Sequence, residues 1–384
     1  MIIIYNPAKG DTVDPIAVLD YTRSDDQYSI AQINQYVRSV GIEAAKGKTI
    51  NLANLRTYSL DYSMSFTHSG INYGDSLKSK FSATIYNAPM ELIGLLNIKQ
   101  YVSSENINAL STATKSIIDP QVSFPTGGFV IRRNSNVTDI ITRTFMIYST
   151  PFNFDSRRLN STLNLNGSQF DSMVIRLQFA VNLNKNSSLV SQIKTILSGQ
   201  GFTVNSDDSL SDIPPVIERY YPPAPINSVL SEVCRDNDIA FDINSDKKEI
   251  TLKSLSPDDA PQESQNDKIL TFNNYIPGSY ILASLSLQNY ASCMFEAEAF
   301  DVQLFESISI YDDSFSEGLF ANLRQIPGTI PAGSAILKGY RFYVLEYTYT
   351  DSVEKTTVSV RGTNNWLINN FKLDTFLENK IYGN

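Results

Sequence analysis

The feature that most limits what this chain can fold into is a helix-to-strand unit that occurs twice, at 188–204 and at 226–252. In each copy, apolar residues recur at helical spacing and then alternate as they do in a strand. A shift of 37 residues pairs Leu189 with Ile226, Ile193 with Leu230, Ile196 with Val233, Leu197 with Cys234, Phe202 with Ile239, and Val204 with Phe241. The second copy continues through the turn-forming residues Asn244, Ser245 and Asp246 into another alternating segment, which predicts a β-hairpin. Two copies fall short of a solenoid, which needs about three or more, so they predict one small α/β domain.

The segments on either side of this unit are typical of β-structure. Short alternating runs rich in Tyr, Phe, Thr and Ile fill 57–185, with a single helix-like interruption, PMELIGLL, at 89–96. Similar runs fill 269–363, after the polar stretch LSPDDAPQESQNDK at 255–268, which is typical of an exposed linker. We therefore expect an α+β, mainly β chain in which two β-barrel-like domains flank the small α/β domain.

Two further segments complete this organisation. Near the N-terminus, SIAQINQYVRSVG predicts a helix that begins after Ser29 and ends at Gly41. Between the two repeats, the five prolines of DIPPVIERYYPPAP predict a rigid connector, because proline fixes the backbone and removes a hydrogen-bond donor. The expected divisions are an N-terminal extension (1–56), the first β-barrel-like domain (57–185), the small α/β domain (186–268), the second β-barrel-like domain (269–363) and a C-terminal docking segment (364–384).

Composition narrows the possible functions. With 384 residues the chain can hold about two to four domains. Its formal net charge of −9 argues against a general attraction to nucleic-acid phosphates. No run approaches the roughly 18 apolar residues of a membrane span, and no secretory leader is evident, so we expect a soluble protein. Cys234, on the apolar stripe of the second helix, is expected to be a reduced, buried thiol.

Two motifs resemble ligand-binding loops but fail on spacing. GIEAAKGKT, at 41–49, has five residues between its glycines, whereas a phosphate-binding loop needs four. Asp242 begins a run that resembles a calcium loop, but Lys247 occupies the sixth position, where glycine makes the turn. Lys253 then replaces the carboxylate at the twelfth position. The first motif is expected to be a basic turn and the second a hairpin.

Catalytic constellations are equally hard to assemble. His68 is the only histidine, and it is expected in a turn-like stretch, HSGINYGDS, with no nucleophile elbow around a serine. Glu296 and Glu298 share one face of a predicted strand, which is more typical of a solvated face than of a glycosidase pair. We therefore expect no enzyme, and no catalytic, metal-binding or cofactor-binding residues.

The order of β domain, helix-strand pair and second β domain resembles the central hub proteins of phage tails and related contractile injection machines. The phrases that carry the resemblance are KFSATIYNAP, RTFMIYSTPFNFDSRRLNSTLNLNGS, ILSGQGFTV, PPAPINSVLSEVCRDNDIAFDINSDKKEITL and LKGYRFYVLEYTYTDSVEKTTVSVRG. Their order matters more than any one of them, and together they cover 57–363. The stretches 1–56, 101–120 and 364–384 have no counterpart.

The resemblance implies a structural virion protein, assembled in the host cytoplasm and located in the tail or baseplate. It implies a homotrimer whose β domains alternate as six similar units and join a hexameric tail tube to a trimeric spike or tail tip. The implied partners are the tail tube protein, the spike or tail-tip protein and other baseplate proteins, with DNA only passing through the lumen. The 21 Tyr and 20 Phe would supply low-charge ring contacts or simply fill two β cores. Alternatives are a cell-surface or carbohydrate-binding β module of a virion and a tail-associated hydrolase.

The C-terminal segment, NNWLINNFKLDTFLENKIYGN, contains more apolar surface than a free tail leaves in water. Leu373, Phe376, Leu377 and Ile381 could line one face of a helix. One interpretation is that the segment folds back on the last β domain. The other is that it docks on a neighbouring protomer or the next tail component. The candidate partner-docking residues are Trp366, Phe371, Phe376 and Leu377.

Overall fold

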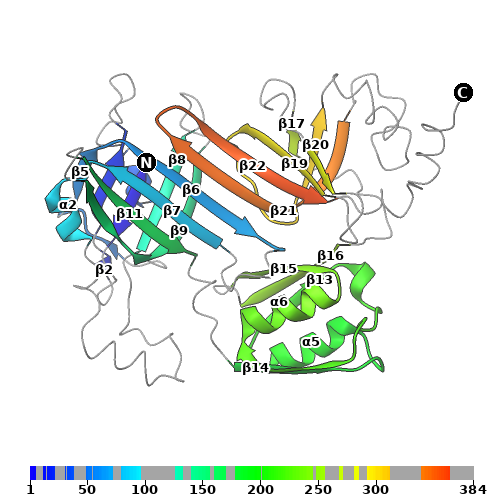
Figure 1. Ribbon diagram of the computed structural model, residues 1–384. Coiled ribbons are helices and arrows are strands. Elements are labelled where there is room, and N and C mark those ends of the chain that lie inside the picture. Colours follow the sequence, from blue (N-terminus) through cyan, green and yellow to red (C-terminus); the bar gives the residue numbers. More distant parts are fainter. Residues whose placement is uncertain are drawn as a thin grey trace, which may run out of the picture.

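The computed structural model describes a mainly β protein. The described residues are 1–5, 12–13, 15–21, 31, 33–38, 49–53, 55–71, 79–96, 126–132, 140–155, 160–169, 178–199, 201–244, 248–255, 268–270, 281–284, 292–311 and 339–363. They form one large sheet, with a small α/β domain below it in Figure 1. This arrangement confirms the α+β, mainly β class. None of the described helices is long and apolar enough to cross a membrane.

The first half of the large sheet uses strands from the N-terminal part of the chain. Hydrogen bonding orders them as β6 (Tyr62–Ser69), β7 (Ser79–Tyr86), β11 (Asn160–Ser168), β9 (Ile140–Ser149), β8 (Thr126–Arg132), β1 (Ile2–Tyr5), β3 (Pro15–Asp20) and β5 (Arg56–Ser59). Strand β10 (Phe152–Asp155) adds to β11, and β2 (Thr12–Val13) pairs with β4 (Thr49–Ile50). Helix α2 (Met90–Leu95) confirms the predicted helical interruption.

Strand β1 explains why the chain opens with an apolar run. It lies between β3 and β8, and every one of its side chains is buried. Ile2 and Ile4 belong to the main hydrophobic core, whereas Ile3 and Tyr5 pack with Tyr36, in the helical residues 33–38. A strand buried on both faces requires consecutive rather than alternating apolar residues. The N-terminal residues are therefore an integral part of the first β half.

The second half of the large sheet is built around a long hairpin. Its strands are β21 (Gly339–Ser352), β22 (Thr356–Thr363), β19 (Ser292–Glu298), β18 (Ile281–Ser284), β20 (Ser307–Tyr311) and β17 (Lys268–Leu270). Strands β22, β19 and β18 continue outward from β21 in antiparallel order. The first residues of β21 pair with β20, which leaves its last seven residues, from Glu346 to Ser352, for another partner.

That partner is β6, so the two β halves form one continuous sheet. The seam runs antiparallel from Glu346 opposite Ser69 to Ser352 opposite Ser63. Figure 1 shows the long β21–β22 hairpin extending from the right half toward β6 on the left. A single core cluster spans both halves and includes Phe66 of β6 and Tyr349 of β21. The barrel-like form expected for each half stays a prediction.

The small α/β domain confirms the predicted repeat. Its elements are β12 (Gln178–Leu183), α5 (Leu189–Ser198), β13 (Thr203–Ser206), the 3-10 helix η2 (Asp208–Leu210), β14 (Arg219–Pro225), α6 (Ile226–Asp236), β15 (Ile239–Asn244) and β16 (Glu249–Ser254). Each helix leads into a strand, and β16 lies between β13 and β15. Strands β15 and β16 form the predicted hairpin. Cys234 is fully buried in the core of this domain, as its place on the apolar stripe predicts.

The proline-rich connector is partly a strand. Its second half forms β14, which pairs antiparallel with β12. The register shifts between Phe179 and Val181, opposite Pro222 and Pro223. Proline cannot donate a ladder hydrogen bond, so it is tolerated at such an irregularity. Strand β12 pairs with β14, and its Val181 packs in the core of the small α/β domain. The expected boundary at 185/186 therefore falls after a strand that packs with this domain.

Candidate interaction surfaces and the joint between the domains

The β6–β21 seam is reinforced by a partly buried cation. Arg143 of β9 donates to the Tyr347 hydroxyl (3.4 Å), to the Asp301 carboxylate (2.7 Å) and to the Val302 carbonyl (2.7 Å). Its side chain is 15% exposed. Burial alone would lower the pKa of Arg143, but Tyr347, Tyr349 and Asp301 raise it above the ordinary value, so the guanidinium stays charged. Arg143 thus connects the first β half to β21 and to the segment before β20.

Tyr349 of β21 makes polar contacts within the second β half. Its hydroxyl donates to the Phe300 carbonyl (2.9 Å) and accepts from the Val302 amide (2.9 Å). The ring is fully buried, and burial raises the pKa of Tyr349 above its ordinary value. Thr67 of β6 and Thr348 of β21 also share a hydrogen bond of 2.9 Å across the seam. The bond between Thr67 and Thr348 and the contacts of Arg143 connect the two halves.

His68 lies elsewhere than the sequence predicted. It belongs to strand β6 rather than to a turn, it is buried, and its ring Nε2 lies 3.1 Å from the Asp242 carboxylate of β15. The expectation of a turn was wrong because the alternation of β6 continues through His68 until Ser69. Its contact joins the large sheet to the small α/β domain.

Other contacts also join the large sheet to the small α/β domain. The Phe241 amide donates to the Gly70 carbonyl (3.1 Å), and the Gly70 amide donates to the Leu345 carbonyl (2.8 Å). Ile71, Ala240, Leu255 and Leu345 form a small buried cluster drawn from β15, β21 and the residues that follow β6 and β16. The Lys253 ammonium lies 3.9 Å from the centre of the Tyr343 ring and 3.1 Å from the Asp207 carboxylate. Asp242 and Lys253 are therefore structural contacts of the hairpin and the joint.

The paired glutamates face solvent as expected. Glu296 forms an ion pair with Lys355 (2.9 Å), and the hydrogen bond from Lys355 lowers the pKa of Glu296. Glu298 is exposed, whereas Ala297 between them is buried. Among the residues that the structure describes, no group of three or more His, Cys, Asp or Glu is placed to hold a metal ion. Residues 41–48, which make up most of the motif GIEAAKGKT that we expected to be a basic turn, lie outside the described residues.

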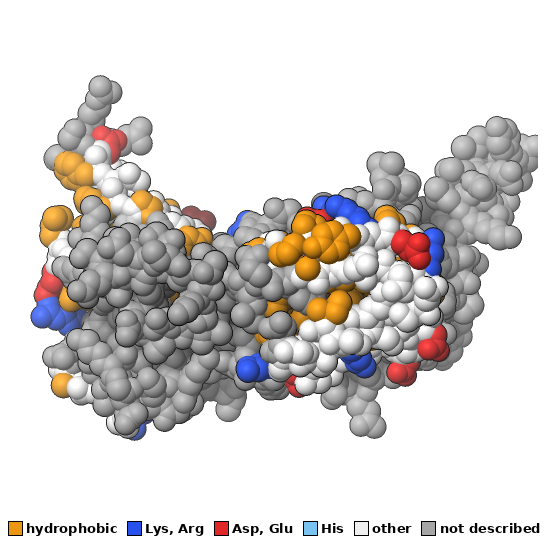
Figure 2. Space-filling view, turned by 90° about the horizontal axis from the view of Figure 1, so that it is seen from below, with side chains coloured by type: hydrophobic (Ala, Val, Ile, Leu, Met, Phe, Trp, Pro, Cys, Tyr) orange, Lys and Arg blue, Asp and Glu red, His pale blue; other side chains and the backbone are white. Residues whose placement is uncertain are grey.

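Among the described residues, the proline-rich connector carries a group of exposed apolar side chains close together in sequence. These four residues, here named the apolar strip, are Ile213 (43% exposed), Val216 (61%), Ile217 (44%) and Tyr220 (58%). Figure 2 shows hydrophobic side chains gathered on the face of the small α/β domain that is seen from below. The sequence predicted a rigid connector here but not this exposure. Strand alternation could not predict this exposure, because most of the strip precedes β14.

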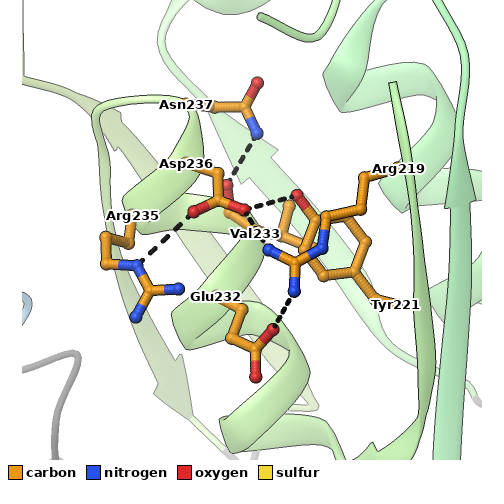
Figure 3. A network of polar contacts seen from close by, with 7 residues as sticks. All are labelled: Arg219, Tyr221, Glu232, Val233, Arg235, Asp236 and Asn237. Atoms are coloured by element: carbon orange, nitrogen blue, oxygen red, sulfur yellow. Dashed lines mark hydrogen bonds and ion pairs between the residues drawn. The ribbon is translucent and has the colours of Figure 1, made fainter. Parts of the chain in front are cut away.

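Figure 3 shows a network of polar contacts that fixes β14, which follows most of the strip, to the end of α6. Asp236, at the end of α6, accepts from Arg219 (3.0 Å) and Tyr221 (3.0 Å), both on β14. Arg219 also reaches Glu232 at 3.4 Å. The Val216 amide donates to the side chain of Asn237 (2.8 Å), which itself donates to the Val233 carbonyl. The strip is therefore an exposed apolar surface on a fixed backbone.

A second group of exposed apolar residues lies on the first β half. It consists of Tyr86 (45% exposed), Met90 (74%), Phe152 (37%) and Phe154 (60%). Phe152 and Phe154 belong to β10, all four residues of which are exposed.

The predicted docking residues Trp366, Phe371, Phe376 and Leu377 lie outside the described residues. The sequence analysis did not single out Arg143, although strand alternation places it on the same inward face as the buried Ile141 and Phe145.

Comparison with known proteins returned solved structures only. No protein-family model and no curated protein matches the chain. The 43 kDa tail protein of prophage MuSo2 from Shewanella oneidensis matches at 6% identity and a TM-score of 0.40, over 80% of this chain and 94% of its own. An Escherichia coli component of the type VI secretion system, described as similar to the T4 bacteriophage tail proteins gp27 and gp5, matches at 12% identity and 0.41, over 79% and 74%. A tail protein from Neisseria meningitidis MC58 matches at 8% identity and 0.40, over 82% and 99%.

All three descriptions name tail proteins or a component likened to them, which is the class that the sequence resemblance indicated. With TM-scores below 0.5 and identities of 12% or less, these likenesses assign no function to this chain.

Proposed function

We propose that this chain is a structural tail protein, a homotrimeric hub that joins a hexameric tail tube to a trimeric spike or tail tip. The observation that supports this function is the correspondence between the two β halves. Outward from the seam, the first half runs β6, β7, β11, β9 and the second runs β21, β22, β19, β18. Every neighbouring pair in both series is antiparallel, and each series begins with a hairpin. One chain thus carries two β units that share a run of four antiparallel neighbours, and three chains would carry six.

The rigid seam suits this role. A ring that matches six-fold to three-fold symmetry needs the two β units of each chain at a fixed angle, since contacts between chains close only for one rotation. The β6–β21 pairing and the Arg143 contacts would supply that fixed angle. The proposed partners are the tail tube protein, the spike or tail-tip protein and other baseplate proteins. The proposed location is the virion tail or baseplate.

DNA is proposed only to pass through the lumen of the ring. Three chains at −9 each carry −27 in total, which disfavours tight binding of phosphates. Measurable binding of duplex DNA by the assembled ring at moderate salt would count against a DNA channel. The chain is proposed to have no catalytic activity. Hydrolysis of peptidoglycan or nucleotides by the pure protein, abolished by one side-chain change, would contradict this.

The deciding experiment measures assembly of the full-length protein. Light scattering after size-exclusion chromatography and negative-stain images over a range of concentrations should show a trimer with a ring-shaped, six-fold-like outline. A protein that stays monomeric throughout and binds glycans would instead indicate a carbohydrate-binding β module. A monomer with hydrolytic activity that depends on one carboxylate would indicate a tail-associated hydrolase. Either result would overturn the hub.

A further inference from the structure

The apolar strip is held in one conformation at both of its bends. The Ile213 carbonyl accepts from the Leu189 amide (2.9 Å), and the Val216 amide donates to the Asn237 side chain (2.8 Å). Pro215, which lies between these two hydrogen bonds, is buried, and its ring fixes the backbone. A preorganised surface loses little conformational entropy when a partner binds to it. The strip is therefore suited to contact another protein segment.

Free carboxylates lie along the same segment. Asp212 and Glu218 are exposed, and each is the direct chain neighbour of a strip residue. Asp208, in η2, is exposed as well. The Glu218 carboxylate accepts from the backbone amide of Lys185 (2.8 Å), but none of the three carboxylates forms an ion pair with a described residue. The strip thus has negative charge beside its apolar side chains.

The cations that follow the strip do not neutralise these carboxylates. Arg219 forms ion pairs with Asp236 (3.0 Å) and Glu232 (3.4 Å), and Arg235 lies 3.4 Å from Asp236. The two guanidinium groups and the two carboxylates of this network balance one another. The charge that a partner meets beside the strip is therefore mainly that of the free carboxylates.

We propose that the apolar strip binds a segment of another protein whose apolar side chains are flanked by Lys or Arg. The apolar side chains of this segment cover Val216, Ile217 and Tyr220, and its basic groups lie beside the free carboxylates. Tyrosine is among the residues that anchor protein interfaces, and opposite charge selects the partner and speeds encounter. A second copy of this chain fits less well, because its net charge is −9. The surface does not require a ring, so the proposal goes beyond the hub function.

The test uses the full-length protein and two labelled synthetic peptides as probes. Both peptides are amphipathic helices with the same leucine face, but one carries lysines beside that face and the other carries glutamates. Fluorescence anisotropy should show that the lysine peptide binds with a Kd at least about tenfold lower than that of the glutamate peptide. This preference should weaken as the salt concentration is raised, because salt screens exposed charges.

The contribution of the apolar side chains is tested by the double variant Val216→Ser with Ile217→Ser. It removes apolar surface without adding charge, and it should weaken binding of the lysine peptide by at least about tenfold. The matched control is Met90→Ser with Phe154→Ser, which changes two comparably exposed residues on the first β half and should leave binding unchanged.

The contribution of the carboxylates is tested by Asp212→Asn with Glu218→Gln, which leaves the apolar side chains in place. Glutamine can still accept from the Lys185 amide, so the local structure is retained. The variant should reduce the preference for the lysine peptide by about two- to tenfold. The matched control, Glu298→Gln with Glu354→Gln, neutralises two exposed carboxylates of the second β half and should keep the preference.

Several results would overturn the proposal. These are equal binding of the two peptides, binding of neither peptide, or binding that survives the serine variant of the strip. Self-association of the protein that the serine variant abolishes would assign the strip to a second copy and would also refute it. If the serine variant fails to fold, the carboxylate variant still decides. None of these results bears on whether the chain forms a ring, which light scattering reports separately.

Discussion

The Tyr349 hydroxyl should contribute disproportionately to holding the segment before β20 against β21. Tyr349→Phe removes one oxygen and leaves the ring in place, so packing is unchanged. The oxygen makes two hydrogen bonds of 2.9 Å, one with the Phe300 carbonyl and one with the Val302 amide. Both partners belong to buried residues, with Val302 0% exposed and Phe300 7% exposed. Losing the buried hydrogen bond that the Val302 amide donates costs about 1–3 kcal/mol, and we expect a loss of that size.

Tyr347→Phe is the matched control for this prediction. Tyr347 is similarly buried on the same strand, but its hydroxyl accepts only a long hydrogen bond, 3.4 Å, from Arg143. Its loss should cost less than about 1 kcal/mol, because hydrogen bonds weaken at such lengths. Since a chain with more than one domain need not unfold in one step, the assay is native-state amide exchange over 299–306. Equal effects of the two variants, or no effect of Tyr349→Phe, would refute the idea that one hydroxyl fixes this segment.

Local geometry gives four further predictions. Gly167→Ala should destabilise the first β half by about 1–3 kcal/mol, because a Cβ there would lie 2.5 Å from a backbone carbonyl oxygen of β9. Gly94→Ala, in α2 with nothing within 4 Å, should stabilise by up to about 1 kcal/mol, and urea unfolding compares the two. Asp236→Ala removes the shared acceptor of three side chains and should cost about 1–2 kcal/mol, seen as faster exchange in β14. Glu296→Gln should destabilise slightly at pH 7. The lowered pKa of Glu296 in the fold means that its contribution is present above the ordinary value of 4.5 and is lost as pH falls below it, so the two proteins should converge in acid. A difference that persists at low pH would show that the Lys355 contact is not its cause.

Local periodicity predicted the parts of the fold that depend on neighbouring residues. The two helix-to-strand units, the β15–β16 hairpin and helix α2 all lie where their apolar spacing indicates. Burial of Cys234 followed from the same spacing. The inward orientation of Arg143 could also have been predicted from the sequence, because strand alternation places it on the same face as Ile141 and Phe145.

The sequence by itself therefore determined the kind of each of these elements, their order along the chain and the tail-hub resemblance, because these depend only on local patterns and on their succession along the chain. Only the tertiary structure decided that β6 pairs with β21, since Thr67 and Thr348 are 281 residues apart and strand alternation does not select a distant partner. The same holds for the contact of His68 with Asp242, which requires the small domain to be docked before the two side chains can meet. The exposure of Val216 and its neighbours likewise depends on which surfaces the rest of the chain leaves uncovered, and no local pattern contains that information.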